Sequence, residues 1–359
     1  MTKQEQHTQG LRKVRAGKGA LTLCALVLAE PASAAIYQSA KIKFYGDFRT
    51  RFEADFESQT SAGVAREVRN RLRIRERVGF NYTPDKTWDF GMRLRSGSDF
   101  SQQSPHITIL DFDDNDTGDA QFNFDKWFLK GKAAGGAYWV GRNSLPYWKQ
   151  NEFFWDDDVT PAGVGGTYKL PTKNKHTVEI NAGYFSLPAG MQAFSGEMGT
   201  AQVAYHADIF SVAGGLLSIN ANPNDPDGAL LQRGNGARDY NTWIVSAQLR
   251  LKAGDKPLKL GADIMSNTEN YSSTDPDPNT ANNFDQTDGF DIFVLWGSTK
   301  PKDWLLGYYY ANIEALAVNS SYAQDDWVRW GSAPVSYTHL RAHETTSLIS
   351  YAVFCLKMG

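Results

Sequence analysis

The sequence predicts an all-β fold, a transmembrane antiparallel β-barrel. Apolar or small residues alternate with charged residues over segments long enough to cross a bilayer as tilted strands. Short turns alternate with long polar loops between these segments. Aromatic residues are abundant, with 10 Trp, 16 Tyr and 20 Phe. The main apolar run, Ala20–Ala29, is about half of the ~20 residues that a membrane helix needs, which excludes helical spans.

The period of two is clearest in the first two expected strands. From Ile42 to Phe56, every second residue is apolar or small, and most residues between them are charged. In 69–82, one parity carries a row of arginines, which a helix would scatter around its axis and a strand stacks on one face. Both segments are longer than the typical soluble strand of about 5–6 residues. They fit strands that cross a membrane.

The same alternation, in places weaker, predicts the remaining strands at 88–95, 121–131, 136–142, 163–170, 177–186, 198–206, 210–220, 243–252, 258–264, 290–296 and 304–310. About thirteen strands are therefore expected between 41 and 316. Bacterial single-chain barrels have even strand numbers. We therefore expect about 16 or 18 strands in the intact protein and a C-terminal truncation in this chain.

The connections support a barrel over a soluble sandwich. Short turns with Pro, Asp or Lys are expected at 83–87, 171–176, 253–256 and 299–303. Long loops rich in Asn, Asp, Gly and Ser are expected at 98–119, 221–240 and 267–287. Short turns at one end and long loops at the other are typical of membrane barrels. A soluble sandwich would also alternate, but its charged face would be outermost.

The two ends differ from this pattern. Residues 1–34 combine a basic leader, the apolar core Ala20–Ala29 and the small-residue sequence Ala32-Ser33-Ala34, which predicts a cleaved signal peptide. The alternation stops in 334–359, and the segment SYTHLRAHET at 336–345 resembles the translation of a sequencing adapter. We therefore expect the barrel to occupy 35–333 and the tail 334–359 to be artefactual.

Charge and composition exclude several functions. The formal net charge is −3, which argues against a nucleic-acid partner. Cys24 and Cys355 both lie in the end segments, so no disulfide framework is expected. His106, His176 and His206 show no metal-ligand spacing, and no glycine-rich phosphate loop is evident. We expect neither an enzyme nor a bound metal or cofactor.

Several segments resemble the outer-membrane porins of Gram-negative bacteria. They are RNRLRIR at 69–75, GMRLRSGSD at 91–99, GRNSLPY at 141–147, WDDDVTPAG at 155–163 and DDWVRWG at 325–331. The WDDDVTPAG segment is the most specific, although the family usually has an acidic residue where this chain has Ala162. The resemblance covers about residues 40–332. It implies a pore-forming β-barrel in the outer membrane.

In such a barrel the charged parity faces the lumen, because arginine on the lipid face costs ~2–4 kcal/mol at the bilayer midplane. This predicts a basic, pore-lining wall on three neighbouring strands, formed by Lys43, Arg49, Arg51, Arg69, Arg71, Arg73, Arg75, Arg77, Arg93 and Arg95. Basic pore linings favour anions. The alternative is that Asp47, Glu53, Asp55 and Asp89 neutralise the wall across strands.

Two acidic segments are candidates for the opposite side of a constriction: Asp111, Asp113, Asp114 and Asp116 in one, and Asp156, Asp157 and Asp158 in the other. Folded inward, the first segment would face the arginines and create a transverse field. The alternatives are an exposed loop for the first, and a turn or a bridge to surface cations for the second. The first segment lacks the Gly and Glu of a calcium loop, so calcium is not expected.

These features predict a passive diffusion channel for small hydrophilic solutes, with a preference for anions. A channel for an acidic polysaccharide or oligosaccharide would also need an electropositive lumen. An alternative from another class is a plugged adhesion or structural barrel that acts through its long loops. In each case the expected partner is outer-membrane lipid, with homo-oligomers expected for a channel.

Overall fold

The computed structural model describes residues 22–29, 41–55, 69–103, 105–113, 120–172, 176–300, 303–324, 335–342 and 351–357. Fourteen consecutive strands form the body: β2 (Ile42–Asp55), β3 (Arg69–Tyr82), β4 (Trp88–Ser96), β5 (Ile107–Asp111), β6 (Phe122–Ala133), β7 (Gly136–Arg142), β8 (Ala162–Pro171), β9 (Thr177–Ala189), β10 (Gln192–His206), β11 (Phe210–Asn220), β12 (Tyr240–Ala253), β13 (Lys256–Asn267), β14 (Asp288–Gly297) and β15 (Trp304–Ile313). The helical elements are short: η1 (Pro226–Leu230), η2 (Gln232–Gly234) and α1 (Pro278–Asn282). No helix in these ranges is long or apolar enough to cross a membrane.

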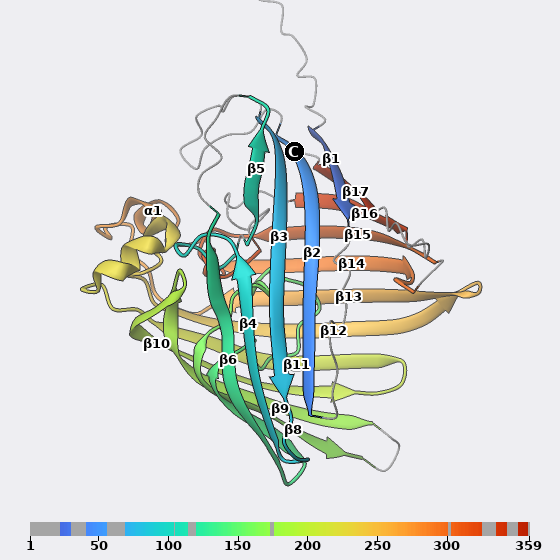
Figure 1. Cartoon of the computed structure of the whole chain (residues 1–359). Coiled ribbons are helices and arrows are strands. Elements are labelled where there is room, and N and C mark those ends of the chain that lie inside the picture. The colour runs from blue at the N-terminus through green and yellow to red at the C-terminus, as the bar shows by residue number, and fades with distance from the viewer. Residues whose placement is uncertain are drawn as a thin grey trace, which may run out of the picture.

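Antiparallel pairing runs without a break from β2 to β15. β4 pairs directly with β6, and every later strand pairs with the next along the chain. The sheet curls strongly, so that β2, β3, β4 and β6 pass in front of the strands from β11 to β15 in Figure 1. The predicted all-β antiparallel fold is confirmed.

Three further strands lie in the end segments of the chain. They are β1 (Thr22–Ala29), β16 (Val335–Ala342) and β17 (Tyr351–Lys357). β1 pairs with β2 and β17, and β16 pairs with β15. Strand pairing does not test export or cleavage, so the signal peptide at 1–34 and the artefactual tail at 334–359 stay predictions.

The sheet is apolar outside and polar inside. On neighbouring strands, Val245 and Ile264 face each other across β12 and β13, with 56% and 61% of their surfaces exposed. The next residue on β12, Ser246, faces Asp263, and both are buried. A soluble sandwich would show the reverse, because its outer face must meet water. The outer face therefore suits lipid, and we call the enclosed polar face the inner face.

Turn chemistry fits the two ends of the sheet. Ala134 and Gly135, between β6 and β7, have φ of 48° and 82°, as the tight hairpins of twisted strands require. Short connections also follow β3, β8, β10, β12 and β14 at this short-turn end. Most long connections lie at the opposite, long-loop end, where Figure 1 shows α1. The predicted alternation of connections is confirmed.

One strand of the body was not predicted. β5 forms within the segment expected to be a loop at 98–119, because β3 extends beyond β4 at the long-loop end. β4 pairs with Arg77–Tyr82 of β3, whereas β5 pairs with Arg71–Ile74. The expectation of thirteen strands is therefore one too few. The physical reason is that an unpaired strand edge leaves backbone donors and acceptors unsatisfied.

The hydrophobic core lies inside the sheet. Two connections fold onto the inner face: residues 143–161, which we call the lumen loop, and residues 314–324. Phe153, Phe154 and Trp155 of the lumen loop are each 1% exposed. The ring centroids of Trp155 and Tyr322 lie 5.2 Å apart. The interior at this level is filled by packed side chains.

The inside-out pattern predicts the effect of a charge on the outer face. Ile292, near the centre of β14, is 47% exposed. We expect Ile292→Arg to lower the free energy of unfolding by about 2–4 kcal/mol in lipid vesicles, because the guanidinium would enter hydrocarbon. Urea titration measures the change. Ile292→Val is the matched control, and equal stability of the two variants would contradict a lipid-facing position.

Candidate functional site in the barrel interior

The first cluster on the inner face surrounds Glu53. Its carboxylate forms ion pairs with Arg51 at 3.5 Å, with Arg73 at 3.0 Å and with Arg71. These cations come from neighbouring strands, with Arg51 facing Arg73 and Glu53 facing Arg71 across β2 and β3. One acid is thus shared by three arginines. Glu53 therefore neutralises charge across the two strands, as the alternative from the sequence suggested.

A second cluster joins the arginine row to the lumen loop. Arg75 and Arg77 contact Asp47 at 3.0 and 2.7 Å, and Asp158 of the lumen loop at 3.5 and 2.9 Å. Burial opposes ionisation of Asp158, but the charges of Arg75 and Arg77 outweigh it and lower the pKa of its carboxyl. Asp158 therefore anchors the lumen loop to β3 as a carboxylate.

Arg49 differs from its neighbours. It faces Arg75 directly across β2 and β3, and it makes no ion pair with an acid in the part of the chain that the structure describes. His106 lies beside these arginines. The pKa of its imidazole is held well below the usual value by burial and by the charges of Arg51, Arg73, Arg49 and Arg75. Its Nε2 is buried and has no hydrogen-bond partner. The surroundings of Arg49 are therefore strongly electropositive.

The two predicted arginines of β4 are engaged by protein groups. Arg93 donates from Nε to Asp125 of β6 at 3.0 Å, and Asp125 is fully buried. Arg95 is also fully buried and donates to the carbonyls of Ser101, at 2.8 Å, and Gln102. Lys43, by contrast, is exposed near the short-turn end, and Arg69 begins β3 at the long-loop end.

The acidic residues of the first loop lie mainly beside β3. Asp111 ends β5 and faces Arg71 in register. Asp113 is exposed and accepts a hydrogen bond from the amide of Asn70. Asp114 and Asp116 lie outside the described residues. The expected approach of this loop to the arginines is thus seen at Asp111.

The three acids of the second segment have different surroundings. Asp156 is buried, its amide donates to Tyr322 at 2.7 Å, and its carboxylate accepts from the amide of Asp158. Asp157 is exposed and pairs with Lys149 at 2.5 Å. Asp158 forms ion pairs with Arg75 and Arg77 of the basic wall. The three acids therefore have different contacts, and their role at a constriction stays a prediction.

The far side of the lumen loop is anchored on other strands. Trp148 donates its amide to Gln202 of β10 at 2.8 Å. Gln150 and Asn151 donate side-chain hydrogen bonds to Asp263 of β13 at 2.8 and 2.9 Å. The loop therefore crosses the enclosed space from β3 to β13.

The sequence of the chain matches a known family. Residues 64–249, more than half of the 359-residue chain, match the family model described as "Putative porin". This chain belongs to that porin family. The assignment confirms the resemblance found in the sequence and indicates an outer-membrane channel rather than an enzyme. A search of curated proteins gives no match.

Solved porin structures show weaker similarity. Pseudomonas putida OprB at high pH is 12% identical, with a TM-score of 0.48 over 88% of this chain and 93% of that one. A triple mutant of the Rhodopseudomonas blastica porin is 13% identical, with a TM-score of 0.43 over 88% and 99%. Salmonella typhi OmpF with daunomycin is 12% identical, with a TM-score of 0.43 over 95% and 97%. The family assignment rests on the sequence match.

A basic vestibule at the short-turn end of this porin was not predicted. A space of about 650 Å³ is lined by Lys130, Lys132 and Lys169, with Trp139 at its wall. Lys132 pairs with Asp89 and Lys169 with Glu179. The register shift in β6 lies opposite Arg93 and Leu94, before Lys130 and Lys132. These two lysines are two residues apart, so the period of two in the sequence could have placed them on one face.

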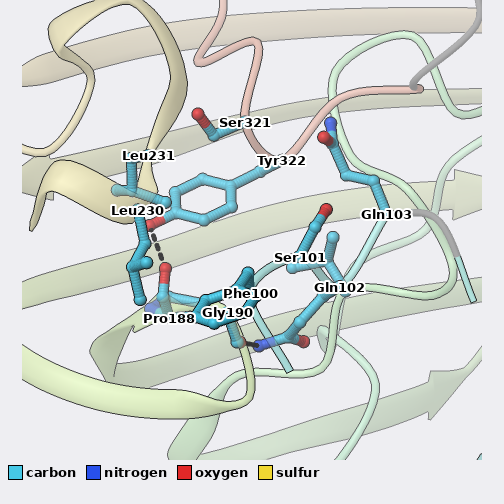
Figure 2. Close-up of a pocket in the computed structure, with 11 residues that line it drawn as sticks. Phe100, Ser101, Gln102, Gln103, Pro188, Gly190, Leu230, Leu231, Ser321 and Tyr322 are labelled. Atoms are coloured by element: carbon cyan, nitrogen blue, oxygen red, sulfur yellow. Dashed lines mark hydrogen bonds between the residues drawn. The ribbon is translucent and has the colours of Figure 1, made fainter. Parts of the chain in front are cut away.

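The long-loop end of the porin is packed much more tightly. Figure 2 shows the small cavity of about 30 Å³ where Gln102, Gly190, Leu231 and Tyr322 meet. The Tyr322 hydroxyl donates to Pro188 at 2.7 Å, and Gln102 donates to Gly190 at 2.5 Å. This volume suits about one water molecule. No group of three His, Cys, Asp or Glu side chains within the described ranges could hold a metal ion.

The anchor at Asp158 predicts a specific loss of stability. Asp158→Asn leaves Arg75 and Arg77 without one of their two acids, so the free energy of unfolding should fall by about 3 kcal/mol in urea titrations at neutral pH. The contribution of Asp158 should be lost as pH falls through its lowered pKa, because protonation removes the ion pair.

Asp157→Asn is the matched control for this variant. Asp157 is exposed, and its pair with Lys149 should contribute within about 1 kcal/mol. Equal effects of the two substitutions would show that the contact of Asp158 with β3 does not anchor the loop.

Proposed function

We propose that this porin is a passive diffusion channel for small hydrophilic solutes that favours anions. The observation that carries the proposal is the row of arginines on the inner face of β2 and β3, in which Arg49 faces Arg75 directly. Asp47, Glu53 and Asp158 make ion pairs with five arginines, whereas Arg49 has no acidic partner in the described ranges. An electropositive lining lowers the electrostatic barrier for anions and raises it for cations.

The basic vestibule supports the same preference. Its lysines lie on the path from the short-turn end towards the lumen loop, so an anion would meet positive charge before the constriction. The nearby Trp139 would also suit an acidic oligosaccharide, because sugar rings and aromatic side chains both present apolar faces. Competition of uronate oligomers with chloride current would distinguish that solute class from a general anion path.

One observation favours a plugged barrel instead. The lumen loop contributes Phe153, Phe154 and Trp155 to a continuous apolar cluster with Tyr322 of segment 314–324. Such packing is typical of a protein core. A plugged barrel would insert into membranes and conduct no current, and its long loops would then carry the function. Oligomer formation remains a prediction for both cases.

Arg49→Ser tests the anion preference. Arg49 makes no ion pair in the described ranges, so its removal strands no acid there and should leave folding intact. In planar bilayers under a salt gradient, we expect stepwise current with a reversal potential favouring anions. In Arg49→Ser the anion preference should fall by about half or more, because one charge near a constriction changes the local potential strongly.

Lys300→Ser is the matched control, since Lys300 is exposed in a short turn and its removal should leave the selectivity unchanged. Current without anion preference in the unsubstituted chain would overturn the selectivity. A folded protein that gives no current would favour the plugged barrel.

A further inference from the structure

The strongest unassigned feature of the interior is a pair of buried carboxyl groups. Asp263 on β13 and Asp291 on β14 face each other directly in register, and both are fully buried. The Nδ2 of Asn151 lies 2.9 Å from Asp263 Oδ2 and 2.7 Å from Asp291 Oδ1, so the two carboxyl groups meet at one amide. Two carboxylates this close in a buried site cannot both stay ionised without a cation.

No cation lies beside this pair in the described ranges. β12 contributes the neutral side chains of Ser246 and Gln248, and β15 places Ala311 opposite Asp291. On β13 itself, Lys259 is four residues from Asp263, which is about 13 Å along a strand. The lumen loop contributes Tyr147, whose pKa is raised by burial, so its phenol stays neutral.

Two charged groups of the lumen loop lie close in sequence to the pair. Glu152 follows Asn151, and burial raises the pKa of its carboxyl. Lys149 is engaged by Asp157 at 2.5 Å. Glu152 is therefore the other group whose ionisation could move the loop, and an experiment must separate it from the pair.

The amide orientations favour a proton over a metal ion. The Oδ1 of Asn151 accepts from the amide of Phe153 at 3.0 Å, and the Oε1 of Gln150 accepts from Gln248 at 3.1 Å. Both side chains therefore point N–H groups, not oxygens, at the carboxyl groups. Asp291 Oδ2 is buried without a hydrogen-bond partner, which leaves one oxygen where a shared proton can reside. A cation would require both amides to abandon these contacts.

We propose that Asp263 and Asp291 share a proton and so hold the lumen loop across the channel, as a pH-dependent latch. With the loop docked, the pair binds one proton at neutral pH. With the loop released, water reaches both groups and each ionises at an ordinary carboxyl pKa of about 4. The docked state therefore binds the extra proton, and docking weakens as pH rises.

Between the ordinary carboxyl pKa of about 4 and the pH at which the docked pair loses its proton, the ratio of released to docked loop should rise about tenfold per pH unit, and above that pH it should level off. The docking contact with Arg75 and Arg77 has the opposite dependence, because Asp158 must stay ionised. Acid should weaken the anchor on β3, and alkali should weaken the anchor on β13.

Two measurements on the full chain test the latch. In planar bilayers, the docked and the released loop should give two current levels. The ratio of the time spent at these two levels is recorded from neutral to alkaline pH for the unsubstituted chain, Asp291→Asn and Asp263→Asn. We expect a pH-dependent ratio in the unsubstituted chain and a flat one in both variants, because the amide keeps the shape of the side chain and cannot ionise. Glu152→Gln is the control and should keep the alkaline dependence.

The second measurement does not need current. Infrared difference spectra should show the C=O stretch of a protonated carboxyl group at neutral pH in Glu152→Gln, and the band should be lost when Asp291→Asn is added. The current readout rests on the proposed channel function, whereas the infrared readout does not. Absence of the band, or a pH dependence that persists in both Asp variants, would overturn the latch. A protein that shows the infrared band but gives no current in the bilayer would instead count against the proposed channel function.

Discussion

Continuous antiparallel backbone pairing is the constraint on which the rest of this structure depends. Lipid offers no hydrogen-bond partners, so each strand must satisfy its donors and acceptors through its neighbours. The pairing from β2 to β15 does this, and it fixes the side chains of every strand to two faces. Because one face meets hydrocarbon, most charged side chains of the strands gather on the other. The same requirement explains β5, which completes the edge of β3 that β4 leaves free.

The inner face encloses many charged side chains, and these charges must be neutralised by one another. Glu53 is shared by three arginines, and Asp47 by Arg75 and Arg77. The lumen loop supplies Asp158 to this wall, and on the far side it supplies amide donors to two acids that have no cation beside them among the described residues. One connection thus meets a row of arginines at one end and a pair of carboxyl groups at the other.

The apolar cluster of the lumen loop bears on whether the interior of the barrel is filled or open. Packed aromatic residues are normal for a protein core, yet the vestibule at the short-turn end remains open and basic. Both features follow from one loop that fills the interior towards the long-loop end. Under the proposed channel function, the contacts that hold this loop would control the width of the passage, and both anchors contain carboxyl groups.

The sequence by itself determined the fold class, the alternation of connections and the row of arginines, because a period of two survives in any strand regardless of its partners. It also marked Asp156–Asp158 as candidates for a constriction. Only the tertiary structure decided that Asp158 of this segment reaches Arg75 and Arg77, that Arg95 donates to backbone carbonyls, and that Asp263 meets Asp291. The reason is physical. These contacts depend on strand register and on the path of a loop across the interior, which bring together residues more than 80 positions apart, as in Arg77 and Asp158, and no local pattern encodes that distance.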